Sequence, residues 1–294
     1  MSELTGVVAM IHGSASDLDD ESIRDYLERV MRGRTPSEEQ IADLRRRYEL
    51  IGGSTHLLER SRQQVDALAA SLGAEFKVAL GAKHSAPFIG DAVRELANTG
   101  VRSLRGVALA PHESRLTTGQ YDEAGAKAAA NVGLRWSMVR SWHTEPGLIA
   151  LWAQLLSEAL AGHGPRPSVL FSAHSLPLVP GDPYPRQVRD TAAAIAGAAG
   201  LPPAQWKVVF QSVPPGVDPS NWLGPNLAES YPTAERVVVA PIGFVSAHLE
   251  VLFDIDIQAR DEAKAVGSEL TRTRMPNEDP RLALAMASAI TATI

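Results

Sequence analysis

Short apolar runs alternate along the chain with longer stretches whose apolar residues recur at helical spacing. The longer stretches include Leu57–Ser71, Phe88–Asn98, Leu148–Leu160 and Leu249–Val266. The short runs are Gly6–Ile11, Glu75–Leu80, Leu104–Ala110, Leu134–Val139, Ser168–Ser172, Trp206–Gln211 and Arg236–Ile242. These runs are almost continuously apolar, as expected of strands that are buried on both faces of a sheet. The alternation therefore predicts an α/β fold in which helices cover both faces of parallel sheets.

The number of strand–helix units is too large for one compact doubly wound domain. Four units precede about Ser141, three or four follow it, and the segment Arg140–Gly147 interrupts the pattern. We therefore expect two similar Rossmann-like domains, residues 1–140 and 141–277, in this chain of 294 residues. The Pro- and Gly-rich stretch Pro214–Pro225 is too long for a tight turn and is predicted to be a functional loop.

Composition narrows the class of function. The formal net charge is −6, and Arg45-Arg46-Arg47 is the one compact basic cluster, which argues against a nucleic acid or an anionic membrane as partner. No apolar run approaches the roughly 20 residues of a membrane span, and the N-terminus lacks the features of a signal peptide. We therefore expect a cytoplasmic protein. Because the chain has no cysteine, it cannot form a disulfide, hold a Cys-ligated iron–sulfur cluster or use a thiol nucleophile.

Histidines gather where the predicted strands end. Of the eight histidines, five follow successive strands: His12, His84, His112, His143 and His174. Ligands of open parallel sheets bind at the carboxyl ends of the strands. Imidazole suits proton transfer near neutral pH and ligation of a transition metal such as Fe²⁺. Each histidine alone could be a loop residue bonded to the backbone, but together they predict an imidazole-rich functional edge.

A second polar feature lies in the predicted helix after the last apolar run. Glu250, Asp254 and Gln258 are four residues apart, so they share one face of an otherwise apolar helix. A mostly buried helix must direct its carboxylates toward solvent, a partner or a cavity. One interpretation is stabilisation of the helix N-terminal half through the macrodipole. The other is a row of carboxylates that passes a hydrated cation inwards.

Several segments identify a family. There is no Gly-x-Gly-x-x-Gly after the first strand, no Walker-type loop, no His-Glu-x-x-His and no Gly-x-Ser-x-Gly, which disfavours a nucleotide enzyme. The chain instead resembles the ferrochelatases, most closely the soluble coproporphyrin ferrochelatases of Gram-positive bacteria, over nearly its whole length. The matching motifs include Phe171-Ser-Ala-His174-Ser-Leu-Pro177, Gly181-Asp-Pro-Tyr-Pro185, Asn221-Trp222-Leu-Gly-Pro225, Pro241-Ile-Gly-Phe-Val-Ser-Ala-His248-Leu-Glu250, Gly81-Ala-Lys-His84, Leu109-Ala-Pro-His112 and Gln120-Tyr121.

The resemblance implies insertion of Fe²⁺ into a free-base porphyrin, with coproporphyrin III as the expected substrate. It implies two Rossmann-like domains with the porphyrin in a cleft between them, and a C-terminal helix over 278–294 that packs back on the first domain. It also implies a monomer that requires no cofactor, with iron as a substrate. His174 and Glu250 match the catalytic, metal-binding pair of the family, and Asp254 matches the next acidic position on the same helix.

Further residues are expected to contact the porphyrin. Arginine forks match the geometry of propionates, which makes Arg32, Arg34 and Arg47 candidates, although each could equally be a solvated surface charge. Trp and Tyr walls suit a flat aromatic ring. We expect the porphyrin-binding residues to be His12, Arg32, Arg47, Ser54, Tyr121 and Trp222.

The sequence departs from its relatives at a few positions. His12 stands where the related enzymes usually carry Tyr, and we expect it to contact the porphyrin metal site. Ala247 stands where Asp is usual, and Gln258 where relatives have Glu. Two other functions stay open: a chelatase for another metal or tetrapyrrole, and a non-catalytic carrier of porphyrin or haem.

Overall fold

Two parallel sheets with the same strand order form the framework of the molecule. The computed structural model describes residues 3–161, 167–214, 216–231 and 236–292. In the first sheet, β1 (Thr5–Ile11), β2 (Phe76–Ala82), β3 (Ser103–Ala108) and β4 (Arg135–Val139) run in the order β2-β1-β3-β4. In the second, β5 (Ser168–His174), β6 (Trp206–Gln211), β7 (Arg236–Ala240) and β8 (Glu269–Arg272) run in the order β6-β5-β7-β8. The predicted α/β class with parallel sheets is confirmed.

All seven predicted apolar runs overlap a strand, and β8 is an addition. It has four residues, of which Leu270 alone is buried, so it carries too little apolar signal to be recognised by sequence pattern. In β1, by contrast, every residue from Gly6 to Ile11 is buried, because helices cover both faces of the sheet.

Helices connect the strands and cover the sheets. Their starts carry recognisable caps: the Asp19 side chain accepts a hydrogen bond from the Ser22 backbone, and Ser37 and Gln40 form a capping box. The α-helices are α1 (Asp20–Val30), α2 (Glu38–Leu50), α3 (Leu57–Leu72), α4 (Ile89–Ala97), α5 (Thr118–Asn131), α6 (Pro146–Ala161), α7 (Tyr184–Ala198), α8 (Arg260–Ala265) and α9 (Pro280–Thr291). The predicted loop 214–225 contains a short 3₁₀ turn at Pro219–Asn221, and its position 215 lies outside the described residues.

The helix predicted over Leu249–Val266 is of two kinds. Its first part, η4 (Glu250–Ala259), is a π-helix, and only Arg260–Ala265 is α-helical. A π-helix closes its hydrogen bonds one residue later than an α-helix and occurs frequently at functional sites. The sequence pattern gives no hint of this, since the apolar residues of the segment fit either form.

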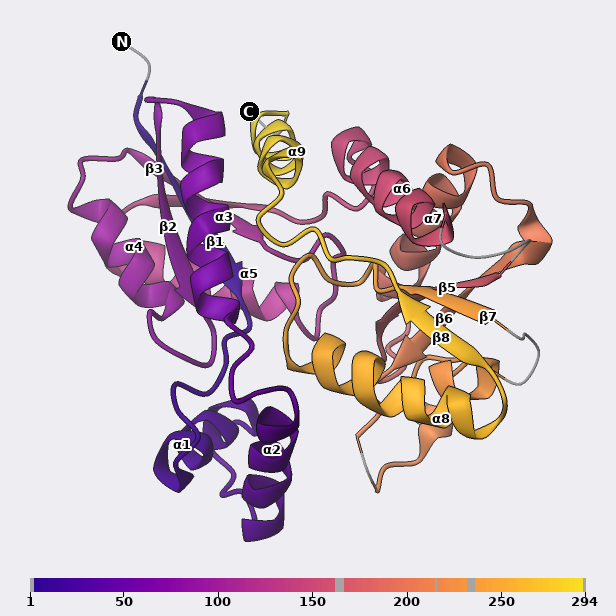
Figure 1. The fold of residues 1–294 in the computed structure, drawn as a ribbon. Helices are drawn as coiled ribbons and strands as arrows, with labels where there is room; N and C mark the ends of the chain where they lie inside the picture. The colour runs from indigo at the N-terminus through magenta and orange to yellow at the C-terminus, as the bar shows by residue number, and fades with distance from the viewer. Residues whose placement is uncertain (1–2, 162–166, 215, 232–235, 293–294) are drawn as a thin grey trace.

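The two halves share one continuous core. A single cluster of buried side chains joins Val7 and Leu68 of the first half to Trp152 and Phe171 of the second. Helix α9 contributes Met286 and other buried residues to this cluster, and Figure 1 shows it between the two lobes. It packs against α3 of the first half and α6 of the second. The last residues of the predicted C-terminal helix, 293 and 294, lie outside the described residues.

The α1–α2 pair stands apart from both sheets, as Figure 1 shows at the lower left. Two loop segments, 12–19 and 51–56, attach the pair to the first half. On its other side α2 meets the π-helix η4 of the second half. The pair therefore bridges the open side between the two sheets.

Candidate active site

A cavity of about 520 Å³ lies between the two halves. Its volume is in the range of sites that enclose a small-molecule ligand. Both halves and the α1–α2 pair contribute to its wall, and its polar groups come from strand ends, helices and the segment around η4. The polar lining residues include His12, Tyr26, Arg47, Tyr48, His112, Tyr121, His174, Tyr184, Ser246, His248, Glu250 and Asp254.

Glu250 lies between two imidazoles on the second-half wall of the cavity. Its Oε1 is 3.4 Å from His174 Nε2, and its Oε2 is 3.4 Å from His248 Nε2. His174 is the last residue of β5, whereas Glu250 opens η4 and His248 precedes it. Gly243 allows this approach, because a Cβ atom there would lie 2.8 Å from the Cα atom of Ala173. The fold thus brings together the catalytic pair that the sequence predicted.

Hydrogen bonds fix the orientation of both imidazoles. His174 Nδ1 bonds to the backbone carbonyl of Ser175, and His248 Nδ1 lies 3.1 Å from the carbonyl of Ser246. A carbonyl only accepts, so both Nδ1 atoms carry hydrogen. Nε2 of each ring is therefore the atom that faces Glu250 and can exchange a proton.

The pair of His174 and Glu250 is charged. Burial alone would lower the pKa of His174, but the negative charge of Glu250 and the hydrogen bonds raise it from 6.5 to about 9. Burial would raise the pKa of Glu250, but the charge of His174 and the bonds from both histidines hold it well below 4.5. At neutral pH the cavity wall therefore carries an imidazolium beside a carboxylate.

Asp254 lies one turn along η4 and also faces the cavity. Ser212 Oγ donates a hydrogen bond to its Oδ2, and Arg47 Nη1 is 3.9 Å from its Oδ1. Burial and the charge of Glu250 raise the pKa of Asp254 from 3.8 to about 6. Gln258 does not continue this row into the cavity, because its Nε2 donates to Glu262 in an exposed pair.

His12 faces the same cavity from the end of β1. Its ring stacks at a tilt against His84, with 4.6 Å between centroids, and Tyr26 meets its edge at 6.3 Å. The His12 side chain is exposed to the open cavity, but the protein atoms around the cavity displace enough water to lower the pKa of His12 from 6.5 to about 4 despite the opposing charge of Glu250. His12 is therefore a neutral imidazole at neutral pH, able to offer a lone pair.

The other predicted residues divide into two groups. Arg47 and Tyr121 line the cavity. Arg32 is exposed just after α1, Ser54 is exposed and accepts a bond from the His56 backbone, and Trp222 forms a backbone bridge to Pro177. None of these last three is among the residues that line the cavity.

Sequence reasoning left some site residues unassigned. His248 was noticed only as part of the motif that ends in Glu250, yet it contacts that carboxylate directly. Tyr26 and Tyr48 line the cavity from α1 and α2. Burial raises the pKa of Tyr48 to about 12, so its phenol stays neutral. The position of a lone tyrosine in an amphipathic helix does not reveal which cavity it enters.

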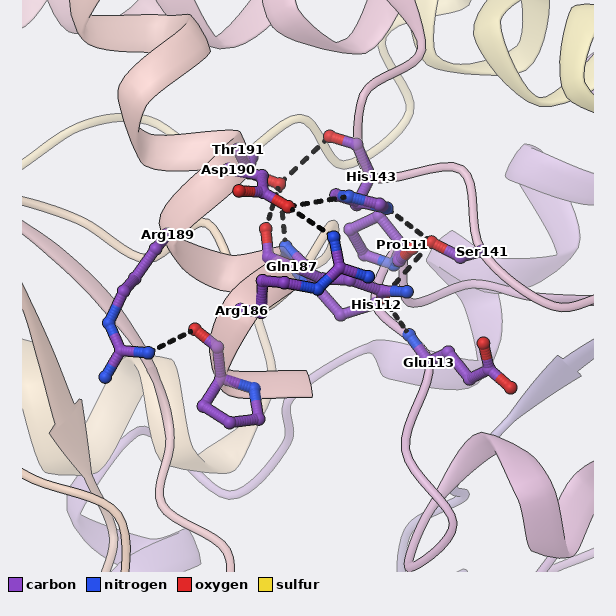
Figure 2. Close-up of polar contacts among 11 residues, drawn as sticks. Pro111, His112, Glu113, Ser141, His143, Arg186, Gln187, Arg189, Asp190 and Thr191 are labelled. Atoms are coloured by element: carbon purple, nitrogen blue, oxygen red, sulfur yellow. Dashed lines mark hydrogen bonds and ion pairs between the residues drawn. The ribbon is translucent and has the colours of Figure 1, made fainter. Parts of the chain in front are cut away.

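A polar cluster beside the cavity joins the two halves, as Figure 2 shows. His112 Nε2 is 2.9 Å from Thr191 Oγ1 of α7, and the same hydroxyl lies 2.9 Å from the carbonyl of His143. Gln187 Oε1 accepts bonds from the Glu113 backbone at 2.7 Å and from Ser141 Oγ at 3.2 Å. Two of the five strand-end histidines thus hold the loops after β3 and β4 against α7.

We searched the described residues for side chains already arranged to hold a metal ion. In the four stretches of chain with described coordinates, no set of three or more His, Asp or Glu side chains is arranged as a metal site. Over the same stretches, no helix combines the length and the apolarity needed to cross a bilayer.

Two sheets of identical strand order around a cavity with a histidine–carboxylate pair define a tetrapyrrole chelatase fold. The SirB protein from Bacillus subtilis, solved with Fe³⁺, superposes with a TM-score of 0.63 at 11% identity, covering 99% of this chain and 95% of that one. CbiX, described as the terminal enzyme of sirohaem biosynthesis in denitrifying bacteria, gives 0.57 at 15% identity and covers 99% of both chains. At such identities the likeness shows the fold.

Sequence comparison identifies the family within this class. The ferrochelatase family model matches residues 4–294. A coproporphyrin III ferrochelatase from Anoxybacillus flavithermus is 36% identical, covering 98% of this chain and 96% of the relative. A ferrochelatase from Herpetosiphon aurantiacus is 37% identical, covering 95% and 96%. The chain belongs to the ferrochelatase family, and it is a metal chelatase that inserts iron into a porphyrin.

Proposed function

We propose that this chain inserts Fe²⁺ into coproporphyrin III, with His174 and Glu250 as the catalytic pair. The observation that carries the proposal is the contact of 3.4 Å between His174 Nε2 and Glu250 Oε1 on the cavity wall. Relatives that cover nearly the whole chain, from Anoxybacillus flavithermus and Geobacillus kaustophilus, are named coproporphyrin III ferrochelatases. Their name supports the choice of porphyrin.

The pair suits the proton chemistry of metal insertion. A free-base porphyrin has two N–H protons that must leave before the metal can occupy the ring. In the resting protein His174 holds a proton because Glu250 is ionised beside it. A dication that reaches Glu250 neutralises this field, which lowers the proton affinity of His174. His174 then releases its Nε2 proton to water that enters the open cavity. The freed lone pair takes the two pyrrole protons one after the other and passes each to water in turn.

Asp254 provides a second carboxylate for the incoming metal. It lies one turn from Glu250 on η4, and both carboxylates face the cavity. Oxygen ligands can replace water around a hydrated cation one at a time. We propose that Fe²⁺ meets Asp254 first and then the pair of His174 and Glu250.

The porphyrin is proposed to contact both walls. Among the cavity residues, His12 would approach the ring from the face opposite His174, and Arg47 and Tyr121 would contact its edge. Arg32, Ser54 and Trp222, which lie outside the cavity lining, stay predicted contacts of the outer substituents. A monomeric state and a cytoplasmic location also stay predictions, the first testable by gel filtration of the purified chain.

Anaerobic absorbance spectroscopy tests the proposal. Fe²⁺ added to the protein with coproporphyrin III should convert the free-base spectrum to that of the iron complex over many turnovers. His174→Ala and Glu250→Gln should lower the rate at least about a hundredfold, the scale of a lost acid–base group, while porphyrin binding persists. His56→Ala, in an exposed side chain, is the matched control.

Each possible result is informative. Normal turnover in His174→Ala would refute the catalytic role of this residue. Tight porphyrin binding without turnover in the unmodified protein would favour a porphyrin or haem carrier. Faster insertion of Co²⁺ or Ni²⁺ than of Fe²⁺ would favour a chelatase for another metal. His12→Ala should shift the Soret band of the bound product if His12 ligates its iron.

A further inference from the structure

Arg47 occupies the crossing point between α2 and the π-helix. Its guanidinium carbon lies 5.3 Å from the centroid of the Phe253 ring, and its Nη1 is 3.9 Å from Asp254 Oδ1. Its Nε is 2.8 Å from Asp43 Oδ2. The side chain is 28% exposed and lines the cavity. One cation therefore touches the metal route and the porphyrin space at the same time.

The guanidinium of Arg47 has an ion pair with Asp43 but, among the described residues, no hydrogen bond of good geometry. No hydrogen bond within the described part of the chain engages it, and its buried Nε lacks an acceptor in suitable geometry despite the nearby Asp43. The distance of 3.9 Å to Asp254 is too long for a hydrogen bond. A forked guanidinium gains two charge-assisted bonds when it meets a free carboxylate. A substrate carboxylate in the cavity would offer that partner.

The charge of Arg47 opposes a metal ion at Asp254. Around Asp254 the described charged and polar partners are Glu250, Arg47, His174 and Ser212. Arg47 reaches Asp254 from α2 and, among the described residues, has no partner on η4 other than this carboxylate and the Phe253 ring, whereas His174 is paired with Glu250. A dication arriving at Asp254 would be repelled at short range as long as Arg47 stays in place.

We propose that Arg47 orders the addition of substrates. In the porphyrin-free protein its positive charge lies 3.9 Å from Asp254 and opposes a metal ion there; when a peripheral carboxylate of the porphyrin draws the guanidinium away, Asp254 becomes free to receive Fe²⁺. Porphyrin binding thus precedes metal binding at Asp254, which prevents the cavity from filling with metal before the ring is present. This inference rests on the proposed function, and Arg47 acts here as a positioning residue.

Mn²⁺ binding to the porphyrin-free protein, followed by loss of the free-ion EPR signal, tests the inference. Arg47→Gln should tighten Mn²⁺ binding about tenfold, because a dication close to a unit charge loses a strong repulsion. Arg46→Gln is the matched control: Arg46 stacks on the same Phe253 ring at 5.5 Å and pairs with Asp43, but makes no contact with Asp254. It should change Mn²⁺ affinity less than twofold, the scale of a screened surface charge.

A double-mutant cycle identifies the site of the effect. Asp254→Asn should change Mn²⁺ affinity little in the unmodified protein, because the nearby charge of Arg47 already opposes a dication at that carboxylate. In the Arg47→Gln background the same change should cancel the gain. The inference is overturned if Arg47→Gln leaves Mn²⁺ affinity unchanged, if Arg46→Gln tightens it equally, or if the gain survives without Asp254.

Steady-state kinetics gives a second readout. Arg47→Gln should raise the KM for porphyrin while it lowers the KM for Fe²⁺. A merely structural link between α2 and η4 would instead raise both, which would contradict the inference. The Mn²⁺ measurements need no turnover, so they stay decisive even if the chain proves to be a carrier.

Discussion

The charge state of His174 is set by a neighbour 76 residues away in the chain, Glu250. Burial pushes the two groups toward neutrality, and their mutual attraction outweighs it, so both stay ionised. Motif resemblance identified both residues, but their protonation could not be predicted, because it depends on a distance that only the fold determines. The contact of His248 with the same carboxylate could not be predicted from the sequence for the same reason.

Replacing Glu250 by Gln should lower the pKa of His174 from about 9 to below 6.5, since burial then acts unopposed. NMR titration of labelled histidines would measure this shift. In the unmodified protein the raised pKa of His174 stabilises the fold fully below pH 6.5, and that contribution is lost as pH rises through about 9. The stability difference between the two proteins should therefore shrink above pH 9. A pKa that stays near 9 in the variant would refute this origin of the shift.

Asp254→Asn should stabilise the protein at pH 7 to 8. The pKa of Asp254 is raised from 3.8 to about 6, so ionisation costs folding free energy as pH rises through that range. The gain should be on the order of 2 kcal/mol at pH 8 and absent at pH 3, where the carboxyl is protonated in both states. Urea unfolding at the two pH values checks it. Equal gains at both values would point to packing instead of charge.

Among the elements, η4 departs furthest from what sequence pattern indicates. A spacing of four predicts that Glu250, Asp254 and Gln258 share one face of an α-helix, and the first two do line the cavity. Because each turn of a π-helix holds more residues than the about 3.6 of an α-helix, steps of four drift around its axis. Gln258, two steps on, ends at the surface beside Glu262. Short β8 escapes prediction for a different reason, because Leu270 is its one buried residue.

Gly243→Ala should perturb the end of β5 on which His174 stands. An added Cβ would lie 2.7 Å from Ala173 Cβ and 2.8 Å from its Cα, so backbone must move. We expect a loss of about 1–3 kcal/mol in stability, typical of overpacking, and slower iron insertion. Gly197→Ala in α7 is the control, because the described atoms leave open space there; it should stabilise by about 0.5–1 kcal/mol. Equal behaviour of the two variants would contradict the steric reading of Gly243.

In the whole molecule, two features hold the two halves together: the continuous core that includes α9, and the polar cluster of Figure 2. The alternating pattern predicted two sheets, because local periodicity reports burial of each strand. It could not predict that the halves share one core. Nor could it predict that Arg32, Ser54 and Trp222 lie outside the cavity lining. Side-chain direction follows from tertiary packing: Arg32, for example, takes a left-handed backbone conformation with φ 58° just beyond α1.

Thr191→Val should loosen the polar cluster. Thr191 and His112 are both buried, and the change removes the oxygen that pairs with His112 Nε2 at 2.9 Å. His112 Nδ1 already lacks a partner among the described atoms, so the ring would lose its remaining side-chain bond. We expect a loss of about 1–3 kcal/mol in chemical unfolding, the cost of an unsatisfied buried polar group. Thr191→Ser keeps the hydroxyl and should cost less; equal losses would argue against the bond.

The repeated strand order places His12 and His174 at corresponding points, each at the end of the central strand that begins its half. A chain built by duplication of one such half would inherit the same imidazole twice, facing itself across an approximate twofold axis. The two histidines have opposite electrical characters: His174 is a cation held by Glu250, and His12 is neutral, with no ion pair of its own among the described residues. A flat ring seated on that axis would meet a proton carrier on one face and an electron-pair donor on the other. Asymmetry within a symmetric frame would thereby give the macrocycle two chemically distinct sides.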